Sequence, residues 1–192
     1  MQTIGVVESS LEVLSKSLVT VLLAELGDKT MIATATLAAV QSPLYVLMLS
    51  LTGYLVANVV PVFVACSAYN YFVGSRWLLN IASGILFIAI GVYILRSKDD
   101  AINAKDLGGT FTALLLSEMG DKTQVATVAV AATSGNPVLP LLGGLLGYLL
   151  ANCSGILLLR LLSGRFPPGR VKVLSAILLI LVGVLTLFSF LL

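Results

Sequence analysis

The sequence predicts an all-α integral membrane protein with six transmembrane helices, arranged as two inverted three-helix repeats. Of its 192 residues, 58% are hydrophobic and only 10% are charged, whereas soluble domains carry about 25% charged residues. The mean hydropathy is +1.07. Apolar runs of about twenty residues recur along the chain, and one polar motif stands in the middle of two of them. Runs of this length can cross a hydrocarbon core of about 30 Å.

The first predicted element is an interfacial lead-in at residues 4–17. Glu8, Glu12 and Lys16 stand four residues apart and would form one polar stripe on a helix. The segment has no basic n-region, so we do not expect a cleaved signal peptide. Six membrane spans are predicted to follow, at residues 18–39, 44–67, 77–95, 109–132, 138–160 and 171–191.

The segments between these spans have compositions that favour turns and loops. They are rich in Pro, Gly, Ser or charged residues, and they cover residues 41–43, 96–106, 134–137 and 163–169. Pro61 falls inside the second span, where a kink is tolerated if neighbouring groups satisfy the freed carbonyl.

The second half of the chain repeats the first. Residues 25–30 (Glu-Leu-Gly-Asp-Lys-Thr) align with residues 118–123 (Glu-Met-Gly-Asp-Lys-Thr), and residues 53–58 align with 147–152. Because each unit has an odd number of spans, the second copy enters the membrane from the opposite side. The predicted units are residues 1–95 (first repeat with the lead-in), 96–108 (central cytoplasmic loop) and 109–192 (second repeat).

Loop charges predict the orientation. Lys and Arg are concentrated in the loops that follow the third and fifth spans. By the positive-inside rule these loops face the cytoplasm and both termini face away from it.

The duplicated motif holds the candidate site. Ionisable residues at mid-membrane depth cost roughly 2.5 to 3.5 kcal/mol each, which favours a functional use. The two acids of each copy stand three residues apart, so on a continuous helix they would share one face. We expect the four carboxylates to meet where the first and fourth spans cross, with two intramembrane amides beside them. The predicted metal ligands are Glu25, Asp28, Glu118, Asp121, Asn58 and Asn152.

Other motif residues are expected to support this site. The lysines are expected either to pair with carboxylates in the empty state or to snorkel toward the membrane surface. The glycines either allow close helix packing or open backbone carbonyls toward an ion. Hydroxyl and amide groups stand behind the acids. The predicted supporting residues are Lys29, Lys122, Thr30, Thr123, Gly27, Gly120 and Gln124.

The ligand atoms that the chain offers determine which metal ions the predicted site would bind. The chain has no His, and Cys66 and Cys153 lie in separate apolar runs, so a soft-ligand zinc or copper site is not expected. Oxygen donors suit Mn²⁺, Ca²⁺ or Mg²⁺. The two motif copies sum to four negative and two positive charges, which one divalent ion would neutralise. An empty site of this charge is expected to take up protons. This predicts cation/proton exchange by alternating access, with no permanent cofactor.

The doubled Glu-x-Gly-Asp-Lys-Thr motif resembles the small calcium/manganese:proton exchangers of Golgi, thylakoid and bacterial membranes. The resemblance covers essentially the whole chain. It implies that Glu25, Asp28, Glu118 and Asp121 form the cation site and that Mn²⁺, Ca²⁺ or both leave the cytoplasm. The short central loop and the lack of a targeting extension resemble prokaryotic members, so we expect a prokaryotic inner membrane or a thylakoid.

Two other classes stay open at this stage. A transporter of another solute, such as an organic cation or an amino acid, would have a larger apolar pocket. An intramembrane aspartyl protease would also use paired Asp residues, but its Gly-x-Gly-Asp pattern requires Gly where Glu25 stands. The expected partners are the lipid bilayer and a divalent cation. A homo-oligomer is left open, and the net charge of +2 gives no reason to expect nucleic acid.

Overall fold

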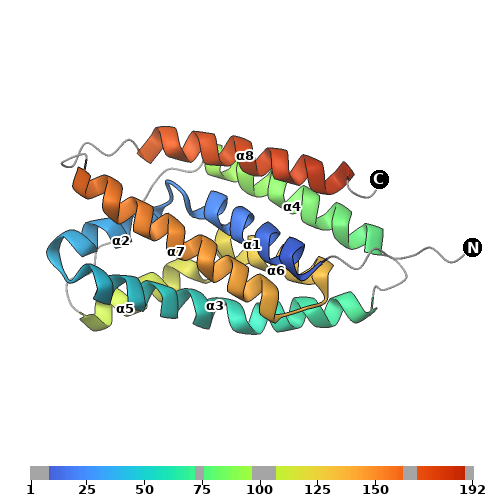
Figure 1. The fold of residues 1–192 in the computed structure, drawn as a ribbon, viewed down its shortest axis with the longest axis horizontal. Coiled ribbons are helices and arrows are strands. Elements are labelled where there is room, and N and C mark those ends of the chain that lie inside the picture. Colours follow the sequence, from blue (N-terminus) through green and yellow to red (C-terminus); the bar gives the residue numbers. More distant parts are fainter. Residues whose placement is uncertain (1–8, 72–75, 97–106, 162–167, 189–192) are drawn as a thin grey trace, which may run out of the picture.

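The fold is that of a computed structural model, which describes residues 9–71, 76–96, 107–161 and 168–188. These residues form eight α-helices and no strand (Figure 1), which confirms the all-helical prediction. The helices are α1 (Ser10–Glu25), α2 (Lys29–Val40), α3 (Pro43–Tyr71), α4 (Arg76–Arg96), α5 (Leu107–Glu118), α6 (Lys122–Ser134), α7 (Val138–Leu161) and α8 (Pro168–Phe188).

The first and fourth predicted spans are each broken into two helices. The breaks fall inside the duplicated motif, between α1 and α2 and between α5 and α6. Gly27 and Gly120 have φ angles of 76° and 74°, a left-handed conformation that Gly adopts without steric cost. The expectation that the two acids of each copy share one face of a continuous helix is therefore wrong. Each Glu ends one helix and each Asp stands just before the next.

The lead-in is also different from the prediction. Ser9 accepts a hydrogen bond from the backbone N–H of Glu12 and caps α1, which then runs without interruption from Ser10 into the predicted first span. Residues 10–17 are thus part of the first helix and not a separate interfacial segment. Glu8, which belongs to the predicted polar stripe, lies outside the described residues.

Two helices are individually long and apolar enough to cross a membrane. These stretches are Pro43–Ser67 in α3 and Val138–Leu161 in α7, and shorter apolar stretches cover Thr30–Ala39, Ile81–Tyr93 and Ala176–Phe188. Pro61 lies within α3 without ending it. Many large apolar side chains face outward on α3, α4, α7 and α8, as expected for helices that contact lipid rather than water.

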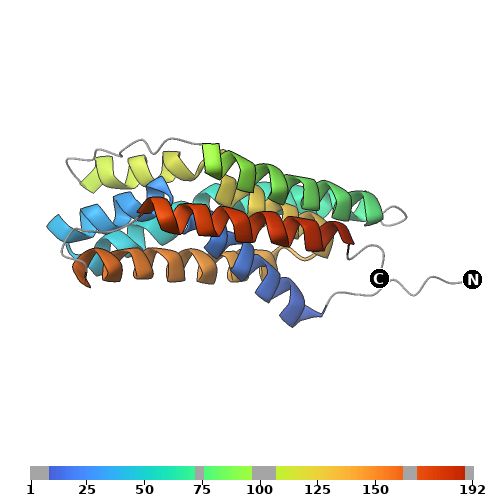
Figure 2. The same cartoon turned by 90° about the horizontal axis from the view of Figure 1, so that it is seen from above.

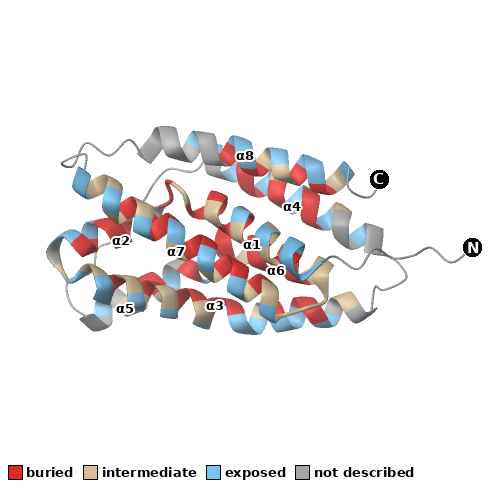
Figure 3. Cartoon of the chain, in the orientation of Figure 1, coloured by how far each residue is buried: buried red, intermediate tan, exposed pale blue. Residues whose placement is uncertain are grey.

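Helices from the two halves of the chain pack against each other. α4 lies along α8 and α1 lies along α7, while α3 contacts both α5 and α6 and α7 contacts both α1 and α2 (Figures 1 and 2). The buried residues gather where these helices meet (Figure 3). A Cβ at Gly84 of α4 would lie 2.9 Å from the carbonyl oxygen of Gly183 of α8, so these two backbones are in direct contact.

Candidate cation site

An ion pair joins the two motif copies. The ammonium group of Lys122, at the start of α6, pairs with the carboxylate of Asp28, just before α2. The Lys122 Nζ also lies 3.7 Å from Oδ2 of Asp121. The side chains of Lys122 and Asp28 are 5% and 8% exposed. The structure therefore places one buried cationic group between an acid of the first copy and an acid of the second.

The local backbone explains why the two Asp side chains are available for this contact. Asp28 and Asp121 occupy N-cap positions with extended backbones, and neither makes a side-chain capping hydrogen bond. The N–H of Asp28 donates to the Glu25 carbonyl at 3.0 Å, and the N–H of Asp121 donates to the Glu118 carbonyl at 3.4 Å. These turns hold each Asp beside the Glu that precedes it.

The two motif glutamates are fully buried but have different surroundings. Glu118 accepts a hydrogen bond from Thr123 at 2.9 Å and another from Tyr148 at 3.1 Å. Neither carboxylate oxygen of Glu25 has a hydrogen-bond partner among the described residues. Glu25 is close enough to Glu118 for the two charges to interact, and the charges of Asp28, Lys122 and Asp121 also act on it.

Asn58 of α3 and Asn152 of α7 are fully buried at equivalent positions. Each side-chain NH₂ donates to the carbonyl one turn earlier, at 2.8 Å to Tyr54 and 3.0 Å to Tyr148. Because only nitrogen can donate to a carbonyl, the amide oxygens must face away from it. Within the described structure both oxygens lack a hydrogen-bond partner. The two amide oxygens are therefore buried and positioned to serve as ligands for a cation.

The remaining predicted residues have distinct roles. Gln124 accepts from the N–H of Gly120 at 2.9 Å and donates to the Ala57 carbonyl at 2.6 Å, so it ties the second break to α3. Thr30 is buried at the start of α2. The side chain of Lys29 lies outside the described part of the structure.

In the described residues, no three Asp, Glu, Cys or His side chains are grouped closely enough to hold one metal ion.

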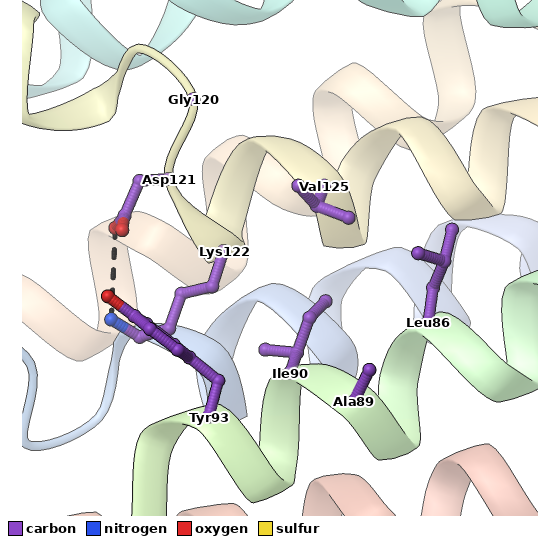
Figure 4. A pocket seen from close by; sticks show the side chains of 8 residues that line it. All are labelled: Leu86, Ala89, Ile90, Tyr93, Gly120, Asp121, Lys122 and Val125. Carbon is purple, nitrogen blue, oxygen red and sulfur yellow. Dashed lines mark ion pairs between the residues drawn. The ribbon is translucent and has the colours of Figure 1, made fainter. Parts of the chain in front are cut away.

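A cavity of about 290 Å³ reaches the second break from the side of α4. Its lining includes Tyr93 of α4 together with Asp121 and Lys122, and Figure 4 shows these side chains at the same end of the cavity. Sequence reasoning did not single out Tyr93. Residues 83–91 align with residues 175–183, which places Leu185 at the position that corresponds to Tyr93. The duplication therefore gave no indication of a role for Tyr93.

Sequence reasoning also missed the hydrogen bond between Tyr148 and Glu118. Tyr54 and Tyr148 stand at matching repeat positions, and their rings stack with centroids 4.8 Å apart. That matching could have suggested a shared place beside the site. Their hydroxyl partners differ, however, because the residues around them differ between the two halves.

Comparisons with known proteins agree on one family. A family model described as "Divalent cation/proton antiporter GDT1" matches residues 13–101 and 106–191. A Vibrio cholerae protein named "Putative manganese exporter" is 27% identical over 190 residues, which cover 94% of this chain and 93% of that protein. The rice "GDT1-like protein 2, chloroplastic" is 39% identical over 44% of this chain and 24% of its own length. An Arabidopsis thaliana protein, "Protein PAM71-homolog, chloroplastic", is 41% identical over 41% of this chain and 21% of its own length. No solved structure matches the chain.

Proposed function

The chain belongs to the divalent cation/proton antiporter GDT1 family, and from this premise we propose that it exports Mn²⁺, Ca²⁺ or both from the cytoplasm in exchange for protons. Membership makes the protein a transporter and not an enzyme. The intramembrane aspartyl protease is thereby set aside, and a transporter of organic cations or amino acids does not fit this family.

One argument favours Mn²⁺, and a second is compatible with both Mn²⁺ and Ca²⁺. The Vibrio cholerae relative, which matches nearly the whole chain, is named for manganese export. The buried donors on hand are carboxylate and amide oxygens, and these hard ligands suit Mn²⁺ and Ca²⁺. Mn²⁺ is therefore the first cation to test.

The observation that carries the proposed mechanism is the ion pair between Lys122 and Asp28. It neutralises acids of both copies with a tethered cation. We propose that an entering divalent ion takes the place of the lysine ammonium and is bound by Glu25, Asp28, Glu118 and Asp121 with Asn58 and Asn152. Protons would compete with the ion for the same carboxylates. An uncompensated negative charge in a low-dielectric interior is costly, and either a proton or the cation removes it.

The proposed transport cycle uses two inverted three-helix units that alternate access to this site. The family model matches two segments that are separated in the central loop predicted from the repeat. The contacts of α3 with α6 have a counterpart in those of α7 with α2. Broken helices with ionisable residues at the break are the usual binding elements of inverted-repeat transporters. In the proposed orientation both termini are non-cytoplasmic.

Proteoliposomes loaded with a pH-sensitive dye test the proposal. Mn²⁺ added to the wild-type protein should release protons, and Asp28→Asn and Asp121→Asn should abolish most of this response. Glu12→Gln removes an exposed carboxylate from α1 and should leave exchange intact. If divalent ions move no protons in the wild type, the exchange function is wrong. If both Asn variants match the wild type, the site is wrong.

A further inference from the structure

The two glutamates of the duplicated motif differ in what holds them. In the first copy neither Glu25 oxygen has a hydrogen-bond partner in the described structure. In the second copy both Glu118 oxygens accept hydrogen bonds, from Thr123 and from Tyr148. The second-copy glutamate is thus held by two hydrogen bonds, and one of them, from Tyr148, comes from outside the motif.

The hydroxyl protons can be traced on the Glu118 side. Tyr148 has one O–H, and it donates this proton to Glu118. The Ser50 hydroxyl lies 2.7 Å from the Tyr148 oxygen, so Ser50 must be the donor in that contact. Thr34 lies 3.4 Å from Ser50 at the other end of the chain of hydroxyls. Groups from α2, α3 and α7 therefore hold a carboxylate that belongs to α5.

Tyr54, the equivalent tyrosine of the first repeat, donates its hydroxyl proton to a different group. Thr127 donates its only hydroxyl proton to the Thr123 carbonyl at 2.8 Å. The contact of 2.7 Å between Tyr54 and Thr127 must then be donated by Tyr54. Tyr54 accordingly has no proton left for Glu25.

One residue difference between the repeats accounts for the different tyrosine contacts. Ser50 stands four residues before Tyr54, and its counterpart four residues before Tyr148 is Gly144. A Cβ at Gly144 would collide with the Tyr54 hydroxyl oxygen, so a serine cannot occupy that position beside Tyr54 as it lies here. Gly144 leaves room for the contact of Tyr54 with Thr127, whereas Ser50 donates a hydrogen bond to the Tyr148 hydroxyl oxygen.

We propose that Tyr148 and Ser50 are positioning residues that fix Glu118 as a preset ligand, while Glu25 is the ligand that adjusts to the bound ion. This inference rests on the proposed function. Because the Glu118 carboxylate is already positioned, binding the cation does not require the entropic cost of ordering that ligand. The Glu25 carboxylate, which has no hydrogen bond to fix it in the described structure, can adjust its position to a bound ion or proton.

The duplication supplies the matched control. Tyr148→Phe and Tyr54→Phe each remove one hydroxyl from fully buried, mutually stacked rings, but only Tyr148→Phe removes a bond to a motif acid. We expect Tyr148→Phe to raise the KM for Mn²⁺ roughly tenfold, the size typical of losing one hydrogen bond to an ionised group. Tyr54→Phe should change KM less than twofold, and both variants should melt at similar temperatures.

Ser50 variants provide a second test of the same hydrogen-bond chain. Ser50→Ala should raise the KM for Mn²⁺ in the same direction as Tyr148→Phe, and the double variant should be little worse than Tyr148→Phe alone, because both changes act through one hydrogen-bond chain. Ser50→Thr keeps a hydroxyl and should restore most of the affinity.

The possible outcomes distinguish a failure of this inference from a failure of the proposed cation/proton exchange. If the wild type exchanges Mn²⁺ for protons but Tyr54→Phe raises KM as much as Tyr148→Phe, the asymmetry is overturned. If the two tyrosine variants differ only in melting temperature, the hydroxyls have a structural role and the positioning role is overturned. If the wild type itself moves no divalent cation, it is the proposed function that fails.

Discussion

Lys122 offers the sharpest test of how the buried acids are neutralised. Lys122→Met keeps most of the apolar stem and removes the charge. The Nζ lies 3.7 Å from Asp121 and still closer to Asp28. At 3.7 Å, two unit charges in a medium of effective dielectric about 20 attract each other by about 4.5 kcal/mol. Part of this is offset by desolvation, and removing one partner of a buried pair typically costs about 3–5 kcal/mol.

The expected result is a large loss of stability that Mn²⁺ repairs. For a chain of this size, each kcal/mol changes the melting temperature by roughly 2–4 °C, so Lys122→Met without metal should melt roughly 6–20 °C below the wild type. Saturating Mn²⁺ should raise the melting temperature of the variant more than that of the wild type, because the ion supplies the missing positive charge.

The assay is thermal unfolding of detergent-solubilised protein with and without Mn²⁺. Arg160→Met is the control, since it removes an exposed positive charge at the end of α7 and should change neither melting temperature appreciably. A variant that melts like the wild type without metal would show that Lys122 does not neutralise the acids. An equal Mn²⁺ shift in both proteins would show that ion and ammonium do not compete for one place.

Three further predictions follow from the geometry. Asn58→Leu and Asn152→Leu should each raise the KM for Mn²⁺ without lowering the melting temperature, because each removes a buried amide oxygen that has no hydrogen-bond partner in the described structure; a lower melting temperature would instead indicate a structural amide. Gly120→Ala should destabilise the protein by about 1–2 kcal/mol in thermal unfolding and Gly120→Asn by less, since the cost comes from a φ of 74° and no atom lies within 4 Å of the new Cβ. Gly84→Leu or Gly183→Leu should separate α4 from α8 and reduce the yield of folded protein in size-exclusion chromatography, because even a Cβ would lie under 3 Å from the facing carbonyl.

The helical segments were predictable because hydropathy reports apolar surface directly. The segment predicted at 138–160 is the helix Val138–Leu161, and the segment predicted at 77–95 is the helix Arg76–Arg96. Hydropathy did not reveal the breaks in the first and fourth predicted spans, because a three-residue turn between two apolar helices barely changes the mean hydropathy of a window. The glycine of the motif was recognised, but it is equally suited to helix packing and to a positive φ.

The pairing inside the site depended on information that the motif does not contain. Sequence spacing suggested that Lys29 or Lys122 would neutralise an acid, and both lysines stand in the same local sequence. Which acid each reaches depends on where the other half of the chain lies. The structure pairs Lys122 with Asp28 of the opposite copy, a contact that local spacing along one helix cannot indicate.

The positions of the breaks explain how an acidic site can be built in an apolar protein. At the end of α1 and of α5 the last helical carbonyls have no partner further along the helix, and the turns use the carbonyls of Glu25 and Glu118 to hold Asp28 and Asp121. At the start of α2 and of α6 the helix dipole is positive and stabilises those same Asp carboxylates by about 0.3–1 kcal/mol each. That is smaller than the cost of burying a carboxylate, so a full positive charge is still required. Lys122 supplies one in this structure, and in the proposed exchange a divalent cation would take the place of its ammonium group.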